Sequence, residues 1–307
     1  MNVIDVRGLT KRFGERTVVN DISLQVRQRE IVGFLGPNGS GKTTTIRMLC
    51  GLLNPDAATG TCLGYDIVRE AALIKLQTGY MTQRFSFYED LTIEENLDFV
   101  ARLYNLHPRR QKVEEVLERI GLGARRKQLA GALSGGWKQR LALAACVMHS
   151  PKLLLLDEPT AGVDPQARRE FWDAIHSLSD EGVTVLVSTH YMDEAERCHR
   201  IVYIMDGHIL ADGTIPELLS HAGLHTLTVR GAGTGALRTQ LESLPGIEQV
   251  APFGDTLHVA GTDHAALLAA VAPFRSDPAL AWSDGETTLE DVFIHLMQRR
   301  RAGTDGR

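Results

Sequence analysis

Three short motifs in this 307-residue chain place glycines, a lysine, hydroxyls and carboxylates at spacings that suit phosphate chemistry. The first is the loop Gly36-Pro37-Asn38-Gly39-Ser40-Gly41-Lys42-Thr43. It fits the pattern G-x-x-x-x-G-K-[ST], follows the apolar run from Ile31 to Leu35, and precedes a segment from Thr44 that can begin a helix. That order favours a phosphate-binding loop over the alternative, a glycine-rich turn beside a surface lysine.

Each residue type in this loop has a physical role in binding phosphate. Glycines let the backbone bend so that several N–H groups point at phosphate oxygens, and the helix start at Thr44 adds partial positive charge. Lys42 can supply a point charge to the β- and γ-phosphates, and Thr43 can offer its hydroxyl to Mg²⁺. The loop therefore predicts a triphosphate site with a magnesium ion.

The second motif delivers two carboxylates after an apolar strand, in the sequence Leu153-Leu154-Leu155-Leu156-Asp157-Glu158-Pro159. The C-terminal edge of a parallel sheet is where ligands of open α/β folds bind. We expect Asp157 to reach Mg²⁺, directly or through water, which leaves Glu158 free to polarise the attacking water. Taken alone, the motif also fits an acidic turn after a strand; behind a phosphate loop in the same chain it favours the catalytic role.

The third motif is Leu133-Ser134-Gly135-Gly136-Trp137-Lys138-Gln139-Arg140, followed by a segment that predicts a long amphipathic helix. Exposed N–H groups at such a helix start suit an anion. Propensity alone favours the simpler alternative, in which Ser134 is only the N-cap of the helix.

The elements that must position these motifs follow an α/β pattern over the first ~220 residues. Apolar runs of strand length occur at Ile31 to Leu35, Leu153 to Leu156 and Val183 to Val187, as expected for strands covered on both faces. A helical insert is predicted over residues 84–135, where Thr92 and Glu95 form a capping box. We therefore predict a mostly parallel sheet with a helical insert.

The C-terminal part of the chain predicts a small second domain of α+β class. Strand and helix patterns follow in the order β-α-β-β-α-β, which is typical of a split βαβ, ferredoxin-like domain. A last amphipathic helix carries Leu289, Val292, Phe293 and Leu296 on one face. We place the domain boundary near Ser220 to Gly223, which divides the chain into residues 1–222 and 223–307.

The phosphate loop, LSGG-x-x-QR and LLLLDEP together resemble the ABC-type ATPases, the motor subunits of ATP-binding-cassette transporters. The resemblance covers residues 1 to about 220 and implies a P-loop ABC ATPase domain that binds ATP and Mg²⁺. It also implies a head-to-tail dimer with a second copy or a homologous ATPase. In that dimer each ATP would lie between the phosphate loop of one subunit and Ser134, Gly135 and Gly136 of the other.

The same resemblance implies roles for four further residues. Gln83 matches the family glutamine that contacts Mg²⁺ or water and links to the transmembrane partner, and Asp164 matches the loop that communicates across the dimer. His190 matches the histidine that contacts the γ-phosphate, and Phe13 occupies the position of an aromatic that stacks on adenine. Three of them have a simpler alternative: Gln83 as an ordinary loop glutamine, His190 as one of eleven histidines without a task, and Phe13 as a core residue.

Two positions depart from the family pattern. Trp137 stands where the signature usually has glutamine, so the contacts of that position are not carried over, although Ser134 and Gly136 are retained. Phe13 replaces the commoner tyrosine, which keeps the stacking surface and loses the hydroxyl.

Softer similarities indicate the kind of motor. The segments Asp90 to Leu97 and Thr288 to Phe293 look like those of ATPases in multidrug and daunorubicin-type exporters of the ABC-2 class. In that class the integral-membrane permease is commonly a separate chain. The last helix either only closes the small domain or also contacts the permease or the dimer mate.

Bulk properties agree with an intracellular ATPase. The formal net charge of −5 argues against a strongly basic nucleic-acid surface, so no nucleic-acid partner is expected. The four cysteines are scattered, as in a reduced protein, and the pattern of apolar residues leads us to expect neither a signal peptide nor a spanning segment. We expect a cytoplasmic protein, peripheral on the inner face of the cell membrane.

Two other functions stay open at this level. One is a soluble ABC ATPase that acts on ribosomes, DNA or Fe–S assembly, although the chain has one phosphate loop and no sustained heptads. The other is a nucleotide-gated dimerisation switch with negligible turnover, against which Glu158 and His190 argue.

Overall fold

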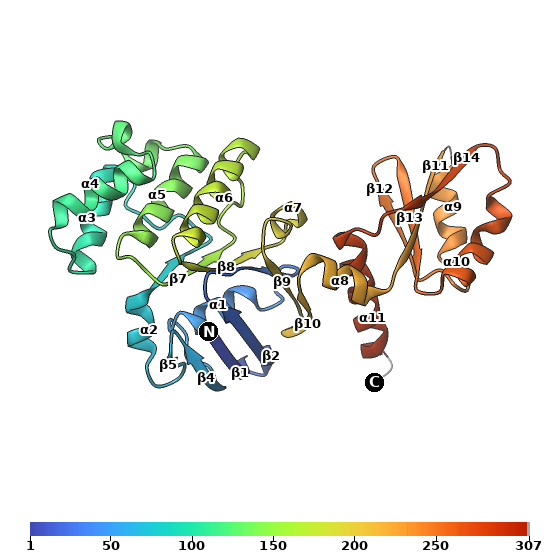
Figure 1. Cartoon of the computed structure of the whole chain (residues 1–307), viewed down its shortest axis with the longest axis horizontal. Helices are drawn as coiled ribbons and strands as arrows, with labels where there is room; N and C mark the ends of the chain where they lie inside the picture. Colours follow the sequence, from blue (N-terminus) through green and yellow to red (C-terminus); the bar gives the residue numbers. More distant parts are fainter. Residues whose placement is uncertain (232, 306–307) are drawn as a thin grey trace. The chain divides into compact units, whose positions relative to one another are not determined.

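A computed structural model describes residues 1–231 and 233–305, and the chain divides into two compact units, Met1–Ala211 and Asp212–Arg307 (Figure 1). The strands that begin in the first unit are β1 (Asn2–Phe13), β2 (Arg16–Arg27), β3 (Ile31–Leu35), β4 (Ala57–Cys62), β5 (Tyr65–Asp66), β6 (Thr78–Met81), β7 (Leu153–Asp157), β8 (Thr184–Thr189), β9 (Arg200–Met205) and β10 (His208–Gly213). Its helices are α1 (Lys42–Leu49), α2 (Ala71–Gln77), α3 (Ile93–Leu103), α4 (Arg109–Arg119), α5 (Gly135–Val147), α6 (Pro165–Asp180) and α7 (Met192–Ala195).

A six-stranded sheet in the order β10-β9-β3-β8-β7-β6 positions the predicted motifs. Its strands β9, β3, β8, β7 and β6 pair in parallel, so their C-terminal ends meet at one edge. Side chains alternate between the two faces: Leu153 and Leu155 pack in one core cluster, whereas Leu154 and Leu156 pack in another. Because both faces are covered, the strand needs an unbroken apolar run, as predicted.

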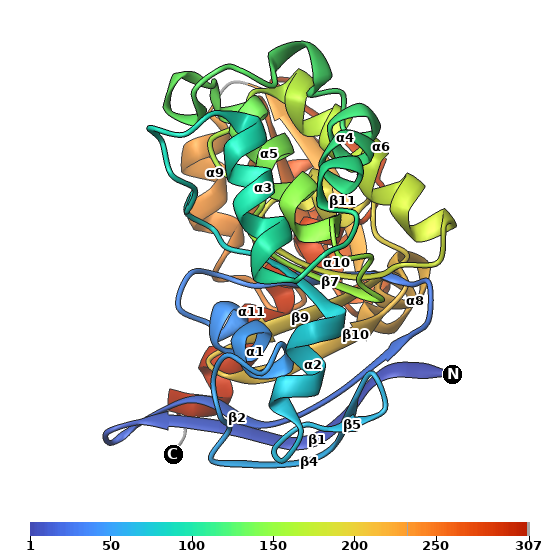
Figure 2. The same ribbon diagram turned by 90° about the vertical axis from the view of Figure 1, so that its left-hand side faces the viewer.

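A second, antiparallel sheet covers one face of the first unit. Its order is β2-β1-β4-β5, and β1 pairs antiparallel with both β2 and β4. Helix α1 lies between the two sheets in both views (Figures 1 and 2), and its Ile46, Met48 and Leu49 join the core cluster shared by the two sheets. The fold is therefore α/β with mixed sheets, and the antiparallel layer is an element that the sequence pattern did not reveal.

The helical insert forms as predicted between β6 and β7. Thr92 caps α3 by accepting a hydrogen bond from the Glu95 amide, and the Glu95 carboxylate accepts one from the Thr92 amide, which confirms the capping box. The expectation of an amphipathic α5 is wrong, because Leu141 to Ala145 are buried without a break. Helix α5 contacts α3, α4, α6 and β6, so little of its second half meets solvent.

The second unit carries a small antiparallel sheet in the order β12-β13-β11-β14. Its elements after β10 are α8 (Ile215–Ala222), β11 (His225–Gly231), α9 (Thr234–Leu241), β12 (Gln249–Phe253), β13 (Thr256–Gly261), α10 (His264–Val271), β14 (Leu280–Gly285) and α11 (Leu289–Asp305). This matches the predicted order of strands and helices. The compact units divide between Ala211 and Asp212, so α8, which contacts α11, belongs with the second unit although the predicted boundary lies after residue 222.

None of the helices within residues 1–231 and 233–305 combines the length and the apolar character needed to cross a membrane.

Candidate nucleotide-binding site

The glycine-rich loop lies between the end of β3 and the start of α1. Three of its glycines have positive φ, with Gly36 at 155°, Gly39 at 81° and Gly41 at 108°, a region that L side chains rarely adopt. A Cβ on Gly36 would stand 2.0 Å from the Ile204 carbonyl oxygen, so only glycine fits there. Helix α1 begins at Lys42 without a side-chain cap within the described residues, which leaves its first N–H groups for a ligand.

Lys42 is almost completely buried at the start of α1, with 3% of its surface exposed. Its Nζ donates to the carbonyl oxygens of Gly36 at 2.6 Å and Pro37 at 3.1 Å, and lies 3.7 Å from Glu158 Oε1. Burial lowers the pKa of Lys42, while the nearby carboxylates of Glu158 and Asp157 oppose that shift. A buried ammonium held by its own loop is well placed to neutralise phosphate.

Thr43 and Asp157 meet at the edge of the sheet. The Thr43 hydroxyl donates to Asp157 Oδ1 at 3.0 Å, and the Ser188 hydroxyl donates to the same oxygen at 2.8 Å. Asp157 is buried at the end of β7, next to Ser188 on β8. The two residues expected to reach Mg²⁺ therefore lie in direct contact, and Ser188 joins them.

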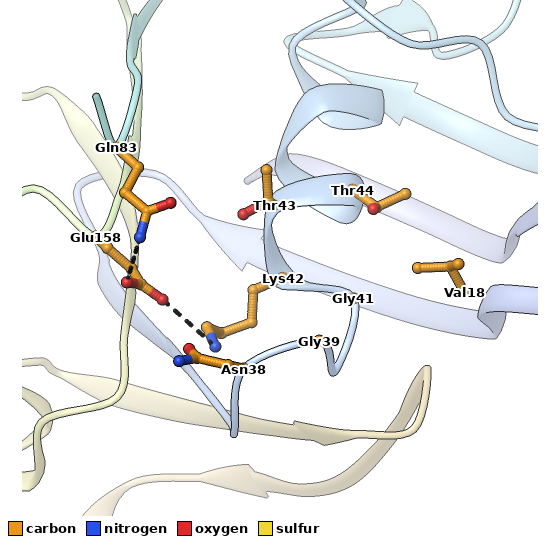
Figure 3. A pocket seen from close by; sticks show the side chains of 9 residues that line it. All are labelled: Val18, Asn38, Gly39, Gly41, Lys42, Thr43, Thr44, Gln83 and Glu158. Carbon is orange, nitrogen blue, oxygen red and sulfur yellow. Dashed lines mark hydrogen bonds and ion pairs between the residues drawn. The ribbon is translucent and has the colours of Figure 1, made fainter. Parts of the chain in front are cut away.

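Glu158 occupies a strained backbone conformation directly after β7, with φ of 47°, which is uncommon for a residue other than glycine. Its Oε2 accepts a hydrogen bond from Gln83 Nε2 at 2.9 Å and lies 3.5 Å from His190 Nδ1. Figure 3 shows the Glu158 carboxylate between Gln83 and the Lys42 ammonium. Gln83 and His190, two of the predicted catalytic residues, thus converge on the carboxylate of the third, Glu158.

These groups surround a hollow of about 270 Å³ that is open to solvent (Figure 3). Its lining consists of loop, helix and sheet-edge residues: Val18, Asn38, Gly39, Gly41, Lys42, Thr43, Thr44, Gln83 and Glu158. Ser40, in the same loop, has a buried hydroxyl without a hydrogen-bond partner among the described residues. Pro37 is exposed in the loop, and its carbonyl holds Lys42.

Phe13 does not lie in this lining. It ends β1 with 52% of its surface exposed, and Lys11 Nζ is 5.7 Å from its ring centroid. It is not a core residue, so the simpler alternative is wrong, and stacking on adenine stays a prediction. Val18, on β2, is the side chain from this region that lines the hollow.

Ser134 and Gly136 line a second hollow, of about 260 Å³, together with Asp164. Ser134 is the N-cap residue of α5, yet in the described part of the chain its side chain makes no capping hydrogen bond. Asp164 caps α6 by accepting from the Ala167 amide at 2.9 Å. A Cβ on Gly136 would lie 2.5 Å from the Cβ of Ala167, so the close approach of α5 and α6 requires glycine there.

Trp137 forms part of the rim of this second hollow. The guanidinium of Arg125 lies 4.4 Å from its ring centroid and that of Arg140 lies 4.9 Å away, two cation–π contacts. The aromatic ring is therefore held at the position where the family signature usually has glutamine.

The two hollows have no lining residue in common among those described. One contains the phosphate loop with Gln83 and Glu158. The other contains Ser134, Gly136 and Asp164, with Gly135 at the first position of α5 between them. Most residues of both hollows were named from the sequence. Their meeting on one nucleotide across a dimer stays a prediction.

Sequence reasoning missed two residues of the site. Ser188 binds Asp157 and also accepts a hydrogen bond from the Glu158 amide at 3.0 Å. Its position two residues before His190, at the end of an apolar strand, was a usable signal. Val18 had no such signal, because its place in the hollow depends on how the antiparallel sheet packs.

The oxygen ligands at this site suit Mg²⁺ better than a metal ion that is bound only by protein side chains. The described residues contain no group of three or more His, Cys, Asp or Glu side chains that could hold a metal ion. Mg²⁺ typically takes one or two protein oxygens and completes its shell with water and substrate phosphates. Thr43 and Asp157, whose oxygens lie 3.0 Å apart, supply hard oxygen ligands of that kind.

Fold and site together define a P-loop nucleotide-binding protein. The ABC transporter family model matches residues 19–161. The chain is 38% identical over 307 residues to Nod factor export ATP-binding protein I of Ralstonia nicotianae, covering 97% of this chain and 94% of that protein. This chain belongs to the ABC transporter family, among its ATP-binding subunits.

Two further relatives extend the comparison. The chain is 36% identical over 301 residues to daunorubicin resistance ATP-binding protein DrrA3 of Streptomyces coeruleorubidus, with 95% of each chain covered. It is 45% identical over 218 residues to the probable multidrug ABC transporter ATP-binding protein YbhF of Escherichia coli, which covers 70% of this chain and 38% of YbhF. The chain thus spans well under half of YbhF, and the predicted similarity to multidrug and daunorubicin-type ATPases is confirmed.

Among solved structures, the chain is similar to the dimeric post-hydrolysis state of the ATP-binding cassette MJ0796 bound to ADP and Pi. The TM-score is 0.62 at 25% identity, with 68% of this chain and 97% of that chain covered.

Proposed function

We propose that this chain binds and hydrolyses ATP and powers an ABC-2-type exporter through a separate integral-membrane permease. One observation carries the proposal: the chain bears a hollow with a lysine and a catalytic carboxylate, and a second hollow with Ser134 and Gly136. Each supplies only part of what a triphosphate needs. Export as the coupled process is supported by the names of the Nod factor and daunorubicin relatives.

Binding of ATP would use the first hollow. The phosphates replace the Gly36 and Pro37 carbonyl oxygens as partners of the Lys42 ammonium, which neutralises charge in a buried setting. The first N–H groups of α1, at Lys42, Thr43 and Thr44, point at phosphate because the helix start has no cap of its own. Mg²⁺, bound by the Thr43 hydroxyl, Asp157 and Gln83, would neutralise charge on the β- and γ-phosphates.

Hydrolysis would use Glu158, Gln83 and His190. Glu158 accepts a proton from the attacking water while the water oxygen bonds to the γ-phosphorus and the bond to the β-phosphate oxygen breaks. Gln83 orients the carboxylate through its 2.9 Å hydrogen bond. His190, 3.5 Å from the same carboxylate, contacts the γ-phosphate and stabilises its developing charge.

The second hollow would serve the nucleotide of a partner copy. Ser134 stands at the start of α5, where N–H groups and the helix dipole favour an anion, and its hydroxyl makes no capping hydrogen bond in the part of the chain that the structure describes. Two copies arranged head to tail would place this surface over the triphosphate held by Lys42 of the other copy. Asp164, which caps α6 beside Ser134, would link the two sites.

The second unit would be a ferredoxin-like accessory domain. Its elements run β-α-β-β-α-β, and β11 pairs antiparallel with both β13 and β14, the order that a split βαβ fold requires. The complex would act at the cytoplasmic face of the cell membrane, where the permease holds the dimer.

The proposal is tested by trapping the dimer with ATP. Glu158→Gln keeps an oxygen that can accept the hydrogen bond from Gln83, but it removes the catalytic base, so bound ATP is not consumed. With ATP and Mg²⁺ the variant should therefore elute as a stable dimer in size-exclusion chromatography with light scattering. Wild type should return to monomer as ATP is consumed. If Glu158→Gln stays monomeric at saturating ATP, the proposal that two copies share each nucleotide is contradicted. If this variant hydrolyses ATP at the wild-type rate, Glu158 is not the catalytic base.

A further inference from the structure

A buried carboxylate lies behind the residues that face the nucleotide. Glu194, on the short helix α7, has 0% of its surface exposed and belongs to none of the motifs above. An ionised carboxylate is unfavourable in the interior unless cations and hydrogen-bond donors compensate it. Its partners therefore show which parts of the chain the carboxylate holds together.

The two oxygens of Glu194 bind different segments. Oε1 accepts a hydrogen bond from the Thr160 hydroxyl and lies 3.4 Å from Arg168 Nε. Oε2 accepts from the Thr189 hydroxyl at 2.6 Å. Thr160 follows β7, Thr189 ends β8 and Arg168 lies on α6, so one side chain joins the end of β8 to the chain after β7 and to α6.

Two of these segments carry the proposed catalytic groups. Thr160 comes two residues after Glu158, and Thr189 directly precedes His190. The Thr189 hydroxyl also accepts a hydrogen bond from the Tyr191 amide at 3.0 Å, which fixes the backbone on both sides of His190. The left-handed conformation of Glu158 needs such fixed surroundings, because a strained residue persists only where its neighbours determine it.

We propose that Glu194 is a positioning residue that sets Glu158 and His190 relative to each other for ATP hydrolysis. It acts through the Thr160 and Thr189 hydroxyls and touches neither water nor nucleotide. The proposal rests on the roles proposed above for Glu158 and His190. Under this proposal Glu194 is needed for ATP hydrolysis but is not needed for ATP binding.

The test compares Glu194→Ala and Glu194→Gln with wild type and with Asp193→Asn. Asp193 is a matched control because it is the neighbouring residue on α7 and pairs with the same Arg168, at 3.3 Å, but is exposed. We expect Glu194→Ala to lower kcat about 100-fold, because misplaced catalytic groups lose orientation. Glu194→Gln, which keeps one acceptor oxygen, should lose about tenfold, while Asp193→Asn stays within about twofold.

The dissociation constant of ATP separates positioning from a merely structural role. In both Glu194 variants it should stay within about threefold of wild type, because Lys42 and its loop are unchanged. If kcat per ATP-binding molecule equals the wild-type value, Glu194 only stabilises the fold and the proposal is overturned. Should Glu194→Ala not fold, a wild-type kcat in Glu194→Gln overturns the proposal in the same way.

Glu158→Gln, measured in parallel, keeps the two proposals apart. Loss of turnover in Glu158→Gln with full turnover in the Glu194 variants overturns the positioning role alone. A wild-type chain without ATP turnover overturns the proposed function and the positioning role together.

Discussion

The two hollows of this chain differ in chemistry. The first holds a buried ammonium, the carboxylate of Glu158 and the Thr43–Asp157 pair, and each of these groups already has a partner within the chain. The second offers a helix start, a glycine in close contact with Ala167, and the hydroxyl of Ser134, which makes no capping hydrogen bond within the described residues. Under the proposed function, the first surface performs the reaction and the second only binds the nucleotide. Substitutions in the first should therefore lower the rate of hydrolysis, and substitutions in the second should weaken the contact between two copies.

The largest effect is expected at the reactive surface. Glu158→Gln should lower kcat by about 1000-fold, because an amide cannot accept the proton of the attacking water. ATP affinity should be retained or increased, since the carboxylate that lies near the phosphates is neutralised. A phosphate-release assay with an ATP-binding titration on the same sample checks this. If Glu158→Gln lowers kcat and ATP affinity by the same factor, the first surface does not separate catalysis from ATP binding.

The second effect concerns the binding surface. Gly136→Ala should lower dimer-dependent hydrolysis about 100-fold, because its Cβ would meet Ala167 at 2.5 Å and displace the start of α5. ATP binding by the monomer should be unchanged. Gly135→Ala is the matched control, since its Cβ would meet the Gly162 carbonyl oxygen at 3.7 Å, an ordinary contact. If both variants behave alike, the tight contact of α5 and α6 does not shape this surface.

The third effect is a pH dependence that belongs to the first hollow. Burial lowers the pKa of Lys42, and bound phosphate favours its charged form. ATP affinity should therefore be highest below that lowered pKa and should fall about tenfold for each pH unit above it. Calorimetric titrations of ATP binding at increasing pH check this prediction.

Two variants serve as controls. Lys42→Gln should bind ATP weakly, and its affinity should not fall at high pH, whereas the affinity of Ser134→Ala should fall as in wild type. An affinity that stays constant up to the ordinary lysine range would show that Lys42 is not desolvated.

The smallest effect lies outside both hollows. Hydrogen bonds from Arg126 and Lys127 lower the pKa of Glu94 from 4.5 to about 2. A lowered carboxylate pKa stabilises the fold above pH 4.5, and this stabilisation is lost as the pH falls from there toward 2. Because the pair of Glu94 and Arg126 is partly exposed and water screens it, Glu94→Gln should lower the free energy of unfolding at pH 7 by less than about 1 kcal/mol.

Denaturant unfolding at several pH values checks this prediction for the helical insert. The difference from wild type should shrink below pH 4.5 and also at high salt, and ATP turnover should be unaffected. A loss of turnover would mean that the charges of the insert belong to one of the two surfaces.

Sequence alone predicts most of the reactive surface, because its residues follow fixed local patterns. The phosphate loop, the pair Asp157 and Glu158, and the capping box at Thr92 each depend on neighbours a few positions away. The strand and helix order of the second unit was also predictable, since each element there shows its own periodicity.

What sequence could not predict depends on contacts between distant segments. Val18 enters the site because the antiparallel sheet packs over α1, and Glu194 acquires its role through Thr160 and Arg168. The predicted amphipathic face of α5 failed for a related reason: other helices and β6 surround its second half, so burial there has no period.

The shared site is tested most directly by mixing two variants that are each inactive, Lys42→Ala and Gly136→Ala. In a head-to-tail heterodimer, the intact phosphate loop of one copy meets the intact Ser134 surface of the other, so one site is restored. An equal mixture should regain about a quarter of wild-type ATP turnover, because half of the dimers carry one of two sites. A mixture as inactive as either variant alone would contradict a nucleotide held between two copies.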